Sequence, residues 1–156
     1  MKKENTMSPI EEILTNPFLI TPICSWIIAQ ILKMIIHTVV YRKFDIKRLF
    51  GDGGMPSGHS ATVASLAVMA ALVYGLGSFQ FALSSIFALV VCHDAMGVRH
   101  EAGKQATVLN ELIKSIKEDG ITDVTLKEFL GHTPMQVLAG IILGILNALL
   151  LGSIIL

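Results

Sequence analysis

The stretch HSATVASLAVMAALVYGLGSFQFALSSIFALVVCHDAMGV, residues 59–98, decides the fold. It holds two apolar runs, 59–76 and 79–98, which only Gly77 and Ser78 separate. A helix crosses a bilayer when it has about 20 consecutive apolar residues. Two such runs with so short a link predict a tight helical hairpin in a membrane.

Two further apolar segments, 17–41 and 134–156, flank the hairpin, and the composition of the whole chain agrees with them. Hydrophobic residues make up 53% of the sequence and charged residues 15%, which is too apolar for a typical soluble domain. The polar stretch 99–133 carries apolar residues at helical spacing, which are Val108, Leu109, Leu112, Ile113 and Ile116. We therefore predict an all-α integral membrane bundle of about four transmembrane helices plus an amphipathic surface helix.

The charges indicate both the orientation and the classes of partner. Nine Lys and Arg residues follow the first and third apolar segments, whereas only Lys2 and Lys3 fall on the other side. This bias predicts that the face with the nine is cytoplasmic and that both termini lie outside. The formal net charge is zero, so nothing indicates a nucleic-acid partner. No Cys or His cluster has metal-ligand spacing, and we predict neither a metal nor a cofactor.

The topology brings the unusual polar residues to one side of the membrane. Residues 56–59 begin the second apolar helix and His132 begins the fourth, while Arg42 follows the first helix and Arg99 follows the third. A shared site at this face is therefore geometrically allowed.

The motif Pro56-Ser57-Gly58-His59 has the residue types of an anion site at a helix start. Ser57 is a good N-cap, and Gly58 lets a ligand approach the backbone where free amides favour negative charge. His59 can donate a proton from the first turn. A capped helix after a glycine-rich turn explains the same residues without any ligand.

A second histidine, His132, begins the fourth apolar helix within GHTPMQVLAG, residues 131–140. A neutral imidazole is a competent nucleophile when a partner holds its other nitrogen. A single histidine at a helix start is more often structural, but two on one basic face are harder to dismiss.

Three charged residues lie within or at the ends of the apolar helices. Lys33 is costly inside an apolar segment unless it has a role, and Asp94 near a helix end needs a partner. Arg99 carries a guanidinium that can hold two phosphate oxygens at once. Satisfying the cytoplasmic charge bias is the alternative explanation for these cations.

The segments GGMPSGHSA, DAMGVRHEAGKQATVLNEL and GHTPMQVLAG together resemble the divergent PAP2 family, which is related to type 2 phosphatidic acid phosphatases and vanadium-dependent haloperoxidases. The resemblance covers residues 17–150. It implies a single divergent PAP2-like membrane domain over 17–156, preceded by an N-terminal extension over 1–16.

The resemblance also implies roles for particular residues. His132 would be the nucleophile and His59 the general acid, while Lys33, Arg42, Ser57, Gly58 and Arg99 would hold phosphate oxygens. The superfamily motif has an aspartate where this sequence has Gln136, so Gln136 or an acidic residue elsewhere would support the nucleophile. Asp94, Glu101 and Glu128 are the acidic candidates.

These features predict a membrane phosphatase that hydrolyses a phosphate monoester or diphosphate, with a lipid as substrate, through a phosphohistidine. Two other functions stay open at this point: a catalytically inactive membrane protein that binds phosphate or lipid, and a small transporter subunit. The sequence also leaves homo-oligomer formation open.

Overall fold

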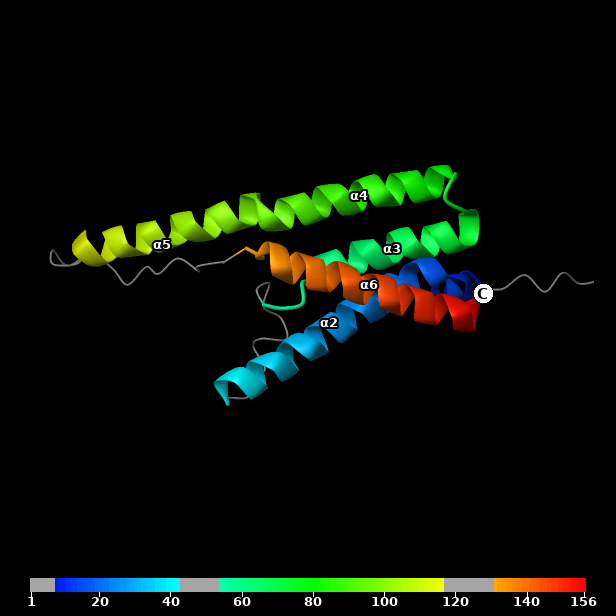
Figure 1. Cartoon of the computed structure of the whole chain (residues 1–156), viewed down its shortest axis with the longest axis horizontal. Helices are drawn as coiled ribbons and strands as arrows, with labels where there is room; N and C mark the ends of the chain where they lie inside the picture. The colour runs from blue at the N-terminus through cyan, green and yellow to red at the C-terminus, as the bar shows by residue number, and fades with distance from the viewer. Residues whose placement is uncertain (1–7, 43–53, 117–130) are drawn as a thin grey trace, which may run out of the picture.

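The computed structural model describes residues 8–42, 54–116 and 131–156, and in these ranges the regular structure is α-helical (Figure 1). The helices are α1 (Pro9–Thr15), α2 (Pro17–Tyr41), α3 (Gly58–Tyr74), α4 (Phe79–Met96), α5 (Val98–Ile116) and α6 (Pro134–Ile155). The four predicted apolar helices exist as α2, α3, α4 and α6, and each ends within two residues of its predicted bounds.

The chain folds as a helical membrane protein, as predicted. Three described spans are long and apolar enough to cross a bilayer: Pro17–Val40, Phe79–Ile113 and Pro134–Ile155. α3 is apolar but has 17 residues. At about 1.5 Å per residue it is about 25 Å long, a little under the roughly 30 Å of a bilayer's hydrocarbon core.

The predicted hairpin between α3 and α4 is confirmed, with residues 75–78 as its link (Figure 1). Gly75 ends α3 with φ of 81°, a conformation that glycine adopts without steric cost, and its amide bonds the Ala71 carbonyl at 2.9 Å. Ser78 caps α4 because its Oγ accepts a hydrogen bond from the Phe81 amide at 3.2 Å.

α3 is the central helix, because it packs against α2, α4 and α6. Its contact with α6 is very close, since every fourth residue on one stripe of α6 is small and buried: Gly140, Gly144, Ala148 and Gly152. A Cβ added at Gly144 would overlap the Ala61 carbonyl oxygen and lie 3.1 Å from the Ala61 Cα. Small residues at such spacing let helix backbones approach within a membrane.

Polar groups join α2 to α6 in the interior. The Asn147 Nδ2 donates hydrogen bonds to the Ser25 Oγ at 2.7 Å and to the Thr21 carbonyl at 3.3 Å. All three residues are buried. Hydrogen bonds of this kind stabilise helix association where apolar burial gives no advantage over lipid.

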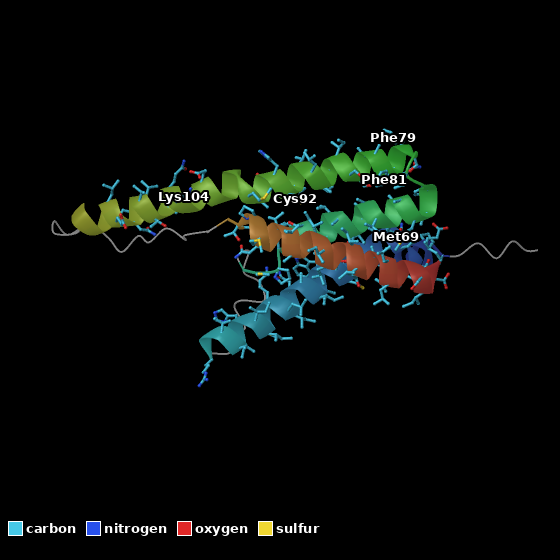
Figure 2. The ribbon with its side chains drawn as sticks, viewed as in Figure 1. Met69, Phe79, Phe81, Cys92 and Lys104 are labelled. Carbon is cyan, nitrogen blue, oxygen red and sulfur yellow. The ribbon has the colours of Figure 1, made fainter. Side chains whose placement is uncertain are left out.

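The apolar core lies toward the end of the bundle at which α3 and α6 begin. Val63, Cys92, Ala95 and Val137 form one buried cluster there, and Met69 is fully buried further along α3 (Figure 2). Large residues such as Ile23, Leu89 and Leu146 are instead exposed on the outer faces of α2, α4 and α6, where lipid meets them.

The predicted amphipathic helix is confirmed as α5. It follows α4 after a turn at Gly97 and extends past the end of the bundle (Figure 1). Among the described residues, α4 is the helix that it contacts. Lys104 on its exposed face forms an ion pair with Glu101 at 2.8 Å (Figure 2).

In the described part of the predicted N-terminal extension, residues 8–16, a capping box begins the short helix α1. The Glu11 carboxylate accepts a hydrogen bond from the Ser8 amide at 2.8 Å, and the Ser8 Oγ accepts one from the Glu11 amide at 3.3 Å. The bond from the Ser8 backbone lowers the pKa of Glu11 below its ordinary value.

Candidate functional site

The motif that begins α3 is fixed by its own serines. Ser57 is the N-cap of α3, and its Oγ accepts hydrogen bonds from the Ser60 amide at 3.4 Å and from the Ser60 hydroxyl at 3.0 Å. Ser57 and Ser60 are fully buried, and Gly58 is the first residue of the helix. The N-cap that the sequence predicted at Ser57 is therefore confirmed.

The two histidines that the sequence singled out lie next to each other. The rings of His59 and His132 have centroids 6.0 Å apart and planes at 85°, an edge-to-face arrangement. His132 is 2% exposed, whereas His59 is partly exposed. Residues 73 positions apart in the sequence thus present two imidazoles to one small space.

Backbone hydrogen bonds hold both histidines in place. The Ser57 amide donates to the Gln136 carbonyl at 3.0 Å, which joins the start of α3 to the first turn of α6. The His132 amide donates to the Ala95 carbonyl at 3.1 Å, which joins the residues before α6 to the end of α4. Three helices therefore meet at the histidine pair through main-chain atoms.

Lys33 lies beside the loop that leads into α3. Its side chain is buried, with 4% of the residue exposed. A Cβ added at Gly54 would lie 3.0 Å from the Lys33 Cγ, so the alkyl stem passes directly along this loop, three residues before Ser57. Gly54 has φ of 109°, which a residue with a side chain rarely adopts.

Neither of the two predicted arginines is described beside the histidine pair. Arg42 is exposed at the C-cap of α2, and this end of α2 lies apart from the beginnings of α3 and α6 (Figure 1). The structure thus does not bring Arg42 to the histidine pair. Arg99 is the second residue of α5, and its side chain lies outside the described residues.

The side chain of Gln136 makes a capping box at the start of α6. Its Oε1 accepts a hydrogen bond from the Thr133 amide at 3.0 Å, and the Thr133 Oγ1 accepts one from the Gln136 amide at 3.4 Å. The hydrogen bond described for the Gln136 side chain therefore stabilises the start of α6. The sequence had placed Gln136 as a residue that orients His132.

The three acidic candidates differ in position. Asp94 is half-buried and directly precedes Ala95, whose carbonyl holds the His132 amide. Glu101 is exposed and paired with Lys104. Glu128 lies outside the described residues. Asp94 is thus the acidic candidate whose neighbour in the sequence, Ala95, bonds the backbone of His132.

One polar residue near this site was missed by the sequence reasoning. Gln30 on α2 is 7% exposed, and its Oε1 is buried without a hydrogen bond among the described residues. It lies one turn from Lys33 and one turn from Trp26, and Trp26 packs on Gly58. The signal was available, because Gln30 precedes Lys33 by three residues in an otherwise apolar run.

The fold and this arrangement define a class: a helical membrane protein with a histidine pair at the junction of three helices. Residues 14–147 match the divergent PAP2 family, and the chain belongs to that family, as the sequence motifs indicated. The chain is also 41% identical over 155 residues to the uncharacterized membrane protein YuiD of Bacillus subtilis (strain 168), with 90% of this chain and 97% of YuiD covered. No solved structure matches the chain.

Proposed function

We propose that the protein is a membrane phosphatase that hydrolyses a lipid phosphate monoester or diphosphate at the His59–His132 pair. The observation that carries the proposal is the 6.0 Å separation of the two rings at the start of two membrane helices. Buried Lys33 beside the same loop supplies positive charge for a phosphate.

The reaction has two steps. In the first, a neutral His132 nitrogen attacks phosphorus, the bond from phosphorus to the leaving oxygen breaks, and protonated His59 gives that oxygen its proton. In the second, water attacks the phosphohistidine, His59 takes the proton of the water, and the nitrogen–phosphorus bond breaks to release phosphate. Lys33, the Ser57 hydroxyl and the Gly58 amide stabilise the charge on the other phosphate oxygens.

The supporting carboxylate in this proposal is Asp94, because its neighbour Ala95 fixes the backbone of His132. A nearby negative charge stabilises the imidazolium and the phosphohistidine. We expect Asp94→Asn to lower kcat by at least tenfold, while Glu101→Gln, which removes an exposed ion pair, changes kcat less than twofold. Equal effects of the two substitutions would remove Asp94 from the mechanism.

The substrate class follows from the membrane location. A phosphate group at the start of α3 and α6 meets the polar boundary of the bilayer, while its tail stays in hydrocarbon. The proposal places this face on the cytoplasmic side, with both termini outside, because of the Lys and Arg bias.

Binding of a lipid phosphate without turnover is the second candidate, and one observation favours it. The Gln136 side chain is engaged in the capping box, where the superfamily motif has a charged aspartate. A binder would bring the phosphate to the same donors and leave it intact.

Phosphate release by the purified protein in detergent separates the two candidates. We expect hydrolysis of lipid phosphates to fall by about 10²–10⁴-fold in His59→Ala, the range for loss of an acid–base group, and at least as far in His132→Ala, which lacks the nucleophile. His93→Ala on the exposed face of α4 is the matched control and keeps the rate. A phosphorus-31 NMR signal of bound phosphate, without any turnover, would favour the protein that only binds. Full activity in both histidine variants would refute the mechanism.

A further inference from the structure

An apolar groove begins at His59 and follows α3 along the bundle. α2 and α4 each pack against α3, and among the described residues they do not pack against each other. The first part of the groove is a pocket of about 390 Å³ between Trp26 of α2, Thr62 of α3 and Val91 of α4, with His59 in its wall.

A second pocket, of about 490 Å³, continues along the same three helices. Leu66 of α3 and Leu83 of α4 line it, and Phe18 and Tyr74 stand at its far end, where their rings stack with centroids 5.2 Å apart. Phe87 of α4 lines both pockets. Its side chain therefore lies where the first pocket meets the second.

We propose that this groove holds the hydrocarbon tail of the lipid phosphate and that Phe87 sets the tail length the protein accepts. The inference rests on the proposed function, since it places the phosphate at His59 and His132. The lining fits such a tail, because both pockets present almost entirely apolar atoms and His59 is the titratable side chain at the polar end.

The dimensions of the groove suit one long chain. Tyr74 lies 15 positions after His59 in α3, which at about 1.5 Å per residue is about 22 Å. Half of the hydrocarbon core measures about 15 Å. A tail that passes Phe87 and fills both pockets therefore reaches into the opposite leaflet, whereas a tail that stops before Phe87 stays in the first pocket.

Selectivity for the length of the tail must come from its steric fit in the groove. A tail in detergent or lipid is already surrounded by hydrocarbon, so entering the groove gains little from the hydrophobic effect. A bulky side chain in the path imposes a steric cost instead. Phe87 is about half exposed and stands on a helix surface, so its truncation opens the path without removing a residue from the closed core.

Photolabelling of the full-length protein in detergent tests the occupant. The probe is hexadecyl phosphate with a diazirine in its tail, and mass spectrometry maps the adducts. We expect adducts on α2, α3 and α4 along the groove, displaced by hexadecyl phosphate at least tenfold better than by hexadecanol. Equal displacement by hexadecanol, or equal labelling of the outer face of α6 at Leu146 and Leu150, would overturn the proposal.

Tail-length selectivity tests Phe87 through binding alone. We expect Phe87→Ala to raise the affinity for hexadecyl phosphate relative to hexyl phosphate by about tenfold, the lower range of what overpacking costs. Val91→Trp, which fills the first pocket, weakens both phosphates, and Leu89→Ala on the exposed face of α4 is the matched control. An unchanged ratio in Phe87→Ala would overturn the role of Phe87.

The two proposals fail in different ways. If labelled hexadecyl phosphate occupies the groove and no phosphate is released, the proposed hydrolysis is refuted and the proposed binding of the tail in the groove is supported. If a water-soluble phosphate ester is hydrolysed in a His59- and His132-dependent manner while the groove stays unlabelled, tail binding in the groove is refuted and the proposed hydrolysis is supported.

Discussion

Replacing Gly144 by alanine tests whether the close contact of α3 and α6 holds the bundle together. The added Cβ would overlap the Ala61 carbonyl oxygen and lie 3.1 Å from both the Ala61 carbonyl carbon and its Cα. These are main-chain atoms of a helix and cannot rotate away, so the two helices must separate. Overpacking costs about 1–3 kcal/mol, and we expect the upper half of that range here.

Gly152→Ala is the matched control in the same stripe of α6. Its Cβ would lie 2.6 Å from the Leu72 Cδ1, which is the end of a flexible side chain and can move aside. Both substitutions gain about 0.5–1 kcal/mol because alanine favours a helix over glycine, so this gain cancels between them. We expect Gly144→Ala to be less stable than Gly152→Ala by about 2 kcal/mol, or roughly 30-fold in the unfolding equilibrium.

The assay is reversible unfolding in a mild detergent titrated with dodecyl sulfate. Far-ultraviolet circular dichroism follows the helices, and the fluorescence of Trp26, the one tryptophan of the chain, follows the packing of α2 on Gly58. The reasoning is refuted if Gly144→Ala unfolds at the same dodecyl sulfate fraction as the unchanged protein, or if Gly152→Ala loses as much stability.

Three further predictions concern other parts of the molecule. Asn147→Leu removes the hydrogen bonds to Ser25 and Thr21 and should lower the unfolding free energy by about 1 kcal/mol in the same titration, while Ser153→Ala on the exposed face should not change it. In Gly54→Ala the residue is strained at a positive φ and its added Cβ lies against the Lys33 stem. Inorganic phosphate should therefore bind about fivefold more weakly, as measured by phosphorus NMR. Unchanged binding would contradict the placement of Lys33 at the site. The pKa of Glu11 is lowered, so its capping of α1 is complete above the ordinary glutamate pKa and is lost as the pH falls through the lowered value; a carboxyl NMR titration should give a midpoint below the ordinary value, and Ser8→Ala should raise it.

The helices were predictable because local chemistry marks their ends. Long apolar runs predicted α2, α3, α4 and α6, and the Ser57 cap begins α3 where expected, whereas α3 ends two residues before the predicted bound of 76. α1 was missed although Ser8 and Glu11 have the spacing of a capping box. The same signal, Thr133 with Gln136, was present at α6 and would have placed the Gln136 side chain correctly.

The candidate site was predictable in part, because topology decides which helix ends share a face. The prediction from topology placed His59 and His132 together, and the 6.0 Å separation of their ring centroids agrees with it. It failed for Arg42, because the course of α2 away from α3 and α6 depends on packing that a hydropathy pattern does not contain (Figure 1). Gln30 was missed although its place three residues before Lys33, in an otherwise apolar run, was a visible signal.

The bonds from the Ser57 amide to Gln136 and from the His132 amide to Ala95 join main-chain atoms only. They form whichever side chains stand at these four positions, unless proline removes the donor at 57 or 132. Substitution at the rim can thus alter charge, acidity or substrate preference without moving the two imidazoles apart. The main chain thus fixes where the two imidazoles lie, while neighbouring side chains set their acidity and substrate preference. Related proteins can therefore diverge in chemistry while they keep the same geometry of the histidine pair.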